Sequence, residues 1–215
     1  MSYIFITRPK FDETTSYLYA WSSLIIDEFK KSNFKVIDLK KSKVNRKNVE
    51  KVLKKMKEKI SFIIFNGHGT PTEICGHNNE PLINTKNKDL LKSKIVYSIS
   101  CNSGKKLGKE IADENTSFLG YREEFLFVID KNKSCTPEKD EIARPFMECS
   151  NQISISLLKG KTVKEAYHDT VERYNRWIIY YSCREYLPES SVILSCLLWN
   201  RNSLVLHGKE DKRLG

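Results

Sequence analysis

Short runs of strand-forming residues alternate with longer amphipathic segments through the first half of the chain. Five apolar runs predict strands, at 3–7, 34–39, 60–68, 94–101 and 116–120. The segments 12–31, 47–59 and 104–114 carry apolar residues at helical spacing, and Asp12 can cap the first of them. Strands that alternate with helices predict a mainly parallel sheet with helices on both faces.

The second half of the chain is more helical. The segments 139–158 and 162–182 predict two long helices, and 125–129 predicts a short strand. Near the end, two apolar runs, 192–199 and 203–207, flank a polar stretch and predict a C-terminal β-hairpin.

No repeat, low-complexity tract or linker-like change of composition divides the chain. A loop or small hairpin is expected at 71–82, where Gly, Asn and Pro are frequent. A hydrophobic content of 40%, with 11% aromatic residues, is enough to build a core and excludes global disorder. We therefore expect one domain over 1–215.

Composition narrows the classes of partner. The net charge is +10, but the lysines are scattered and do not alternate with aromatic residues, which favours a solvated surface over a nucleic-acid platform. An acidic protein partner would also suit this charge. The N-terminus lacks the pattern of a signal peptide, and no apolar stretch approaches the roughly 18 residues of a membrane span. Six dispersed cysteines without a CxxC motif suit a reducing compartment, so a cytoplasmic location is expected.

Two predicted strands end in residues that can carry chemistry. The first ends at His68, which lies between two glycines, and the second ends at Cys101 in the sequence Ser-Cys-Asn-Ser-Gly. The carboxyl ends of parallel strands meet at one edge of a sheet, and chemistry gathers there in α/β proteins. His68 and Cys101 are therefore predicted to be a thiol nucleophile and its proton-transfer partner.

The chemistry of a thiol nucleophile sets further expectations. The attacking species is the thiolate, and the start of the helix predicted at 104–114 would favour negative charge on Cys101. The backbone N–H groups of Gly69 and Cys101 are the expected oxyanion donors. In the alternative interpretation, Cys101 is a small buried residue and His68 a structural hydrogen-bonding group.

Other kinds of site have weaker support in the sequence. Cys75 and His77 follow His68, but no second Cys/His pair with zinc-like spacing follows them, so no metal is expected. Neither GxGxxG nor GxxxxGK[ST] follows any predicted strand, which argues against a nucleotide-binding domain. No cofactor is predicted.

Together, the His68 and Cys101 segments resemble the caspase-like (clan CD) cysteine peptidases, which include caspases, gingipains, separases, clostripain-like enzymes and CHAT-domain proteases. In that family one strand ends in His-Gly and the next core strand ends in the nucleophilic cysteine. The residues 100–104 are closest to the CHAT form, and the tail 203–208 is similar to a terminal strand of gingipain- and CHAT-like domains. The resemblance is strongest over 60–120 and extends by topology over 1–120.

The resemblance implies a three-layer α-β-α sandwich with a His68–Cys101 catalytic dyad and an oxyanion hole from Gly69 and Cys101. The Gln-Ala-Cys sequence of true caspases is absent, so specificity for aspartate is not implied. Glu123 and Glu124 follow the strand 116–120, in a region that lines the specificity pocket in this clan. Acidic groups there, with Asp130 as a further candidate, would suit a basic substrate residue, although all three also fit solvated loop charges.

The expected function is that of a cysteine endopeptidase that cuts a protein partner, after a basic or a large uncharged residue. Members of this clan act on dedicated targets, so a prokaryotic signalling, defence or regulated-proteolysis system is expected. An activating protein partner or self-cleavage would control it, and the loop 130–138 is the expected site of clipping. The alternative is a catalytically inactive caspase-like scaffold or protein-binding module.

Overall fold

The centre of the molecule is a six-stranded sheet, seen in a computed structural model that describes residues 2–32, 34–184 and 186–215. Its strand order is β2-β1-β3-β7-β8-β9, and only β9, at one edge, runs antiparallel to its neighbour. The strands are β1 (Tyr3–Arg8), β2 (Lys35–Lys40), β3 (Ile60–Asn66), β7 (Ile95–Ile99), β8 (Ser117–Tyr121) and β9 (Leu204–Gly208). The mainly parallel sheet predicted from the sequence is confirmed.

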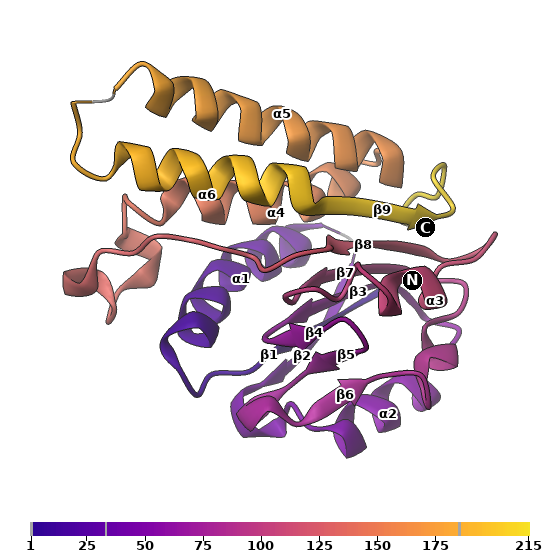
Figure 1. The fold of residues 1–215 in the computed structure, drawn as a ribbon. Coiled ribbons are helices and arrows are strands. Elements are labelled where there is room, and N and C mark those ends of the chain that lie inside the picture. Colours follow the sequence, from indigo (N-terminus) through magenta and orange to yellow (C-terminus); the bar gives the residue numbers. More distant parts are fainter. Residues whose placement is uncertain (1, 33, 185) are drawn as a thin grey trace.

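Helices cover both faces of this sheet and make a three-layer α-β-α sandwich (Figure 1). One face carries α1 (Glu13–Lys31), α4 (Arg144–Leu158), α5 (Val163–Ser182) and α6 (Ser190–Ser203). The other face carries α2 (Arg46–Lys55) and the short α3 (Leu107–Ile111). None of the helices in the described part of the chain combines the length and the apolar character that a membrane crossing needs.

Strand alternation divides the buried side chains between two cores. Ile4, Phe62 and Tyr97 face α1 and the helices α4 to α6, whereas Phe5, Ile63 and Val96 face α2 and α3. All six side chains are fully buried. Because both faces are covered, the chemically useful positions of the sheet are the ends of its strands.

Helix α1 begins immediately after the carboxyl end of β1. The Asp12 carboxylate caps it by accepting a hydrogen bond from the Thr15 N–H at 2.7 Å, and the Thr15 hydroxyl completes a capping box. Tyr17 and Trp21, on successive turns, then anchor α1 in the core. The cap thus fixes Asp12 at the sheet edge where catalytic groups are expected.

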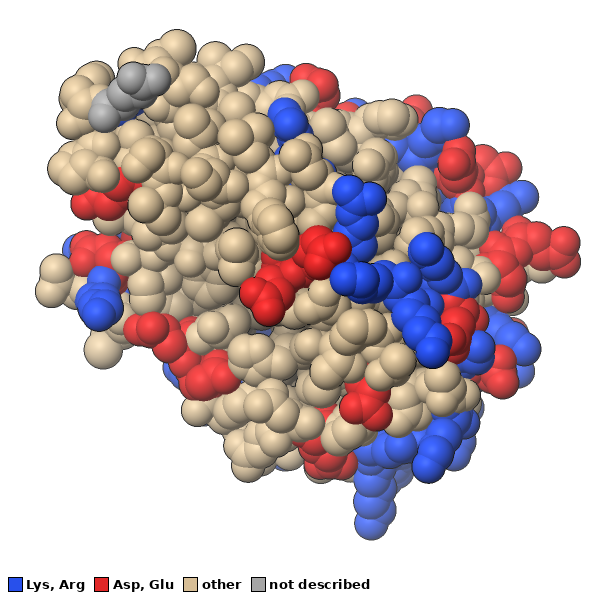
Figure 2. All heavy atoms as spheres, viewed as in Figure 1, with Lys and Arg blue, Asp and Glu red and all other residues tan. Residues whose placement is uncertain are grey.

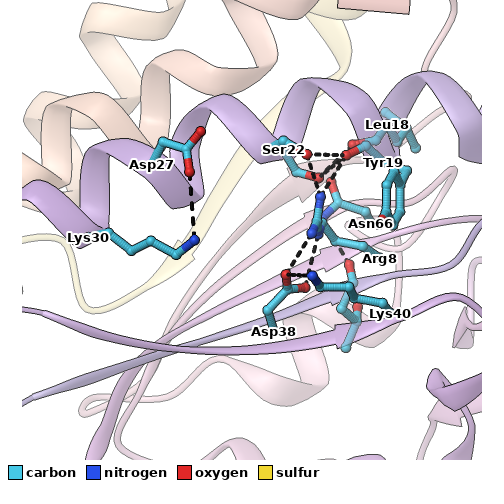
Figure 3. A network of polar contacts seen from close by, with 11 residues as sticks. Arg8, Leu18, Tyr19, Ser22, Asp27, Lys30, Asp38, Lys40 and Asn66 are labelled. Atoms are coloured by element: carbon cyan, nitrogen blue, oxygen red, sulfur yellow. Dashed lines mark hydrogen bonds and ion pairs between the residues drawn. The ribbon is translucent and has the colours of Figure 1, made fainter.

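A partly buried ion pair reinforces the same edge of the sheet (Figure 3). The Arg8 guanidinium at the end of β1 donates to both carboxylate oxygens of Asp38 on β2, at 2.9 and 2.6 Å. It also donates to the Tyr19 carbonyl at 2.9 Å and to the Ser23 hydroxyl at 2.6 Å. The planar guanidinium therefore ties two strands to α1 through four hydrogen bonds.

The first arm of the predicted C-terminal hairpin is wrong. Residues 192–199 belong to α6, whose buried residues Ile193, Leu197 and Asn200 follow helical spacing. The terminal strand is confirmed as β9, and its antiparallel partner is β8. A short apolar run fits a strand or a buried helix equally well, which is why the pattern misled here.

Two smaller differences from the sequence-based prediction affect the site. Residues 124–130 form no strand, and α3 begins at Leu107, so 101–106 is a turn and not the start of a helix. The small hairpin expected at 71–82 is present, because β5 (Glu73–Cys75) pairs antiparallel with β6 (Pro81–Ile83), and β4 (Gly69–Thr70) adds a third strand beside β5. Short 3-10 turns occupy Lys41–Lys43, His77–Asn79, Lys88–Leu91, Lys131–Lys133 and Pro137–Lys139.

Candidate active site

His68 and Cys101 line one cavity. They follow the neighbouring parallel strands β3 and β7, whose last paired residues are Asn66 and Ile99. The cavity has a volume of about 340 Å³, and its other walls are Glu13, Thr14, Glu124, Phe125, Leu126, Phe127 and Ile129. Both residues therefore border one space at the carboxyl edge of the sheet.

A larger cavity, of about 610 Å³, lies between α1 and the segment that carries Cys135. It contains neither His68 nor Cys101, and Cys135 has no histidine beside it in that lining. We place the candidate site in the smaller cavity because a thiol and an imidazole together can do chemistry that size alone cannot provide.

A glycine bend delivers His68 to the cavity. Gly67 has a φ of +140°, and a Cβ there would lie 2.8 Å from the Cys75 carbonyl oxygen, so a side chain is excluded. The chain turns at this point from β3 into β4. The His68 carbonyl then accepts from the Cys75 N–H at 2.9 Å, which holds the turn and leaves the imidazole one-third exposed.

Asp12 orients the imidazole. Its Oδ2 lies 2.6 Å from His68 Nε2, while its Oδ1 accepts the capping bond from Thr15. Burial alone would raise the pKa of Asp12, but hydrogen bonds from Thr15 and His68 outweigh it and lower that pKa. Because an ionised carboxylate only accepts, it fixes the ring proton on Nε2 and leaves Nδ1 as the basic nitrogen.

Cys101 lies in the turn that follows β7. The predicted stabilisation of its thiolate by a helix terminus is wrong, because α3 begins only at Leu107 and is a five-residue helix. Burial raises the pKa of the Cys101 thiol and the nearby Glu124 carboxylate adds to the rise, whereas the backbone N–H groups of Phe125 and of Cys101 itself oppose it. The resting cysteine is therefore a neutral thiol that needs a base.

Gly69 lies directly against the cysteine turn. A Cβ on Gly69 would lie 2.8 Å from Ser100 Cβ and 2.9 Å from the Cys101 carbonyl oxygen, so glycine is required for this packing. Gly69 is not part of the cavity lining, whereas Cys101 is. The expected oxyanion donors are thus brought close together, and their role stays a prediction.

The three acidic candidates occupy different places. Glu124 lines the cavity. Glu123 pairs with Lys105 at 3.5 Å and borders a separate hollow with Trp199, and Asp130 caps the 3-10 turn at 131–133 by accepting from the Asn132 N–H. The structure therefore brings one of them to the thiol.

Sequence reasoning missed two acidic neighbours of the site. Asp12 was expected only as a helix cap, and Glu13 was not singled out, yet Asp12 bonds to His68 and Glu13 lines the cavity. The sequence feature that could have revealed them is the acidic pair that follows the carboxyl end of β1, because β1 is the strand next to β3.

The remaining predicted candidates lie away from this cavity. Cys75 is buried in β5, where burial, with the nearby Glu73 carboxylate, raises the pKa of its thiol. Within the residues that the structure describes, no three His, Cys, Asp or Glu side chains gather as a metal site requires. On the face drawn in Figure 2, Lys and Arg gather on the side of α2 and α3.

Comparison with solved structures identifies the fold. The chain matches a structure of the complex of Porphyromonas gingivalis RgpB pro- and mature domains with a TM-score of 0.59 and 12% sequence identity. RgpB is a gingipain, and its fold is that of the caspase-like cysteine peptidases. The match covers 99% of this chain but 48% of the RgpB chain, so this chain spans about half of that length.

The fold is caspase-like. No protein-family model matches the sequence, and no curated protein matches it. At this level of identity the likeness establishes a caspase-like architecture and leaves the activity to be argued from the residues of the site.

Proposed function

We propose that the protein is a cysteine endopeptidase that cuts a protein or peptide partner with the dyad of His68 and Cys101. The observation that carries this proposal is that imidazole and thiol, delivered by adjacent strands of a caspase-like sheet, line one cavity. The cavity is open enough to admit a side chain of a peptide, and no cofactor is needed for this chemistry.

The residues support an acyl-transfer mechanism. His68 takes the proton of the Cys101 thiol, and the sulfur attacks the peptide carbonyl. The N–H groups of Gly69 and Cys101 would stabilise the oxyanion, and protonated His68 would give its proton to the departing amine. Water then attacks the thioester and releases the acid product with the thiol restored. Asp12 keeps the imidazole in one orientation throughout.

The cavity walls favour a long basic side chain next to the cut. Glu13 and Glu124 supply carboxylates at the cavity, and Phe125, Leu126 and Phe127 supply an apolar wall. An Arg or Lys side chain has an apolar stem and a cationic end, which match these two kinds of surface. A large uncharged side chain would use the apolar wall alone.

Substitution of Glu124 tests this preference. For Glu124→Gln we expect kcat/KM to fall about tenfold on fluorogenic peptides cut after Arg or Lys, with little change on a leucine peptide, because one charge-assisted contact is lost. Glu123→Gln is the matched control, since Glu123 points to a different hollow and pairs with Lys105. A clear preference of the native protein for Asp peptides would overturn the proposed specificity.

Covalent labelling tests the function itself. The native protein is treated with a peptidyl chloromethyl ketone that carries arginine, and the modified peptide is mapped by mass spectrometry. The expected product carries the label on Cys101. An absence of labelling, or modification of the exposed Cys135 in its place, would contradict the proposal.

The proposal also covers how the peptidase is regulated and the cellular system in which it works. The loop 130–138 contacts the cavity rim, because the Ser134 hydroxyl donates to the Glu13 carboxylate at 3.0 Å. Self-cleavage in this loop, or an activating protein partner bound to it, would alter the rim. We place the enzyme, as one domain over 1–215, in the cytoplasm of a prokaryotic signalling, defence or regulated-proteolysis system.

One observation favours a second function. Burial raises the pKa of the Cys101 thiol, which is the property of a structural cysteine in an inactive caspase-like scaffold or protein-binding module. Such a module would bind its partner without becoming labelled on Cys101, so the labelling experiment separates the two functions.

A further inference from the structure

One short segment carries most of the net charge of the chain. Residues 40–59 include ten basic and two acidic residues, so this segment holds a net charge of +8 out of the +10 of the whole sequence. It comprises the end of β2, the 3-10 turn Lys41–Lys43, α2 and the turn before β3. Basic residues that are dispersed along the sequence thus gather in space on the side of α2 and α3 (Figure 2). We call the exposed surface of residues 40–59 the basic face.

Most lysines of the basic face have no acidic partner. In the part of the chain that the structure describes, its ion pairs involve only Lys40, Arg46 and Lys54. The Glu50 carboxylate holds Arg46 at 2.9 Å and Lys54 at 3.2 Å. The exposed lysines that pair with no described carboxylate include Lys41, Lys43, Lys47, Lys51 and Lys55. An anionic partner would relieve the mutual repulsion of these cations.

Lys47, Lys51 and Lys55 form a row along α2. They are four residues apart, so they lie on one face of the helix, with a rise of about 6 Å from each to the next. In an extended peptide, side chains on the same side recur about every 6.6 Å. Alternate carboxylates of an extended acidic peptide would therefore match the row, one to each lysine.

The basic face begins near the candidate active site. The Phe11 ring packs against the rings of His68 and His77, with centroid distances of 5.9 and 5.2 Å. The His77 N–H in turn donates to the Val44 carbonyl at 2.9 Å, just before the start of α2. A polypeptide that leaves the cavity past His68 can follow this series of contacts to the basic face.

The side chains of the basic face favour an acidic polypeptide over a nucleic acid. Single strands are held by exposed aromatic rings, but the exposed aromatic side chains among the described residues, Tyr180, Tyr186 and Trp199, lie on or between α5 and α6. Arginine binds phosphate with a planar fork, and Arg46, the one arginine of residues 40–59, is committed to Glu50. The lysines that remain are point charges, which suit the separate carboxylates of a peptide.

We propose that the basic face docks an acidic, extended segment of the protein that the peptidase cuts, with Lys47, Lys51 and Lys55 as its central contacts. The inference rests on the proposed function in taking the docked protein as the substrate, whereas the binding itself requires no catalysis. Because one chain would occupy both the cavity and the basic face, docking would raise the effective concentration of its cleavage site. Substrates would then be selected by a feature remote from the cut.

The test is fluorescence anisotropy of a labelled peptide in which Glu and Gly alternate over about ten residues, a length that spans the row. We expect the native protein to bind it and to lose that binding when Gln replaces Glu in the peptide. The triple variant Lys47→Gln, Lys51→Gln and Lys55→Gln keeps good helix formers but removes three charges, so we expect its Kd to be about tenfold higher.

The matched control replaces Lys30, Lys31 and Lys159 by glutamine. These lysines are exposed at the ends of α1 and α4, which cover the other face of the sheet. Because charges so far from the probe are screened by salt, the Kd should stay within about twofold of the native value. An equal loss in the two triple variants, or no binding by the native protein, overturns the inference. Binding of labelled duplex DNA at least as tightly as the acidic peptide overturns the choice of occupant.

Hydrolysis of a fluorogenic arginine peptide separates this inference from the proposed function. With the acidic segment attached to each end in turn, we expect a lower KM at one end for the native protein and no such gain for the α2 triple variant. An unchanged KM at both ends overturns the assignment of the docked chain as the substrate. Failure of the native protein to hydrolyse any of these peptides contradicts the proposed function and leaves the anisotropy comparison as the test of docking.

Discussion

Replacement of Cys101 by alanine is expected to abolish peptide hydrolysis, with a loss of at least about a thousandfold in kcat/KM. The proposed reaction passes through a thioester on this sulfur, and no other thiol lines the cavity. Because removal of a single sulfur atom leaves the surrounding turn bonded to Tyr121 and Glu123, the variant should unfold at nearly the native temperature. The measurements are fluorogenic peptide hydrolysis and thermal unfolding monitored by circular dichroism.

Cys135→Ala is the control for this variant. Cys135 is an exposed thiol that borders a different cavity, so its removal should leave hydrolysis unchanged. Full activity in Cys101→Ala, or an equal loss in Cys135→Ala, would show that Cys101 is not the nucleophile.

Replacement of His68 by alanine is expected to lower kcat by about a thousandfold, because general acid and base catalysis by a positioned side chain contributes on the order of 10² to 10⁴.

Asp12→Asn is expected to lower kcat by a smaller factor, about tenfold. Asparagine caps a helix as well as aspartate does, but it carries no charge to orient the imidazole. Hydrolysis at saturating substrate gives kcat for each variant, and circular dichroism checks that α1 is retained.

The control for His68 is His77→Ala. The Phe11 ring packs against both histidines, with ring centroids 5.9 Å from His68 and 5.2 Å from His77, but His77 does not line the cavity. Equal loss in the two histidine variants would indicate a structural role for both.

The lowered pKa of Asp12 fixes the direction in which this carboxylate makes the stability of the fold depend on pH. Its pKa in the folded protein is lowered from 3.8, so its ionised form stabilises the fold above pH 3.8, and this contribution is lost as the pH falls through the lower folded value. Changes in activity above pH 4 therefore do not come from Asp12.

The sheet and the central pair of residues could be predicted from the sequence because both depend on local patterns. Apolar runs that end just before His68 and Cys101 define β3 and β7, and two parallel strands joined by a crossover must end at the same edge. From this argument the sequence alone predicts that His68 and Cys101 lie at the same edge of the sheet. The first arm of the expected hairpin failed because the run 192–199 has no internal turn residue and fits α6 as well as a strand.

The rest of the site depends on contacts between residues far apart in the chain. Asp12 already had a sufficient local explanation as a helix cap, and its contact with His68 follows only from the pairing of β1 with β3. Asn200 reaches Leu126 across 74 residues, and neither position carries a motif. Long-range hydrogen bonds of this kind leave no periodic signal in a sequence.

A single carboxylate links the start of α1 to the histidine of the proposed dyad. One oxygen of Asp12 binds the Thr15 amide and the other binds His68. Fraying of the first turn of α1 is consequently expected to release the imidazole as well, so that melting of that turn would stop the proposed reaction. Amide exchange at Thr15 and turnover should therefore change together when the amino-terminal turn of α1 is perturbed.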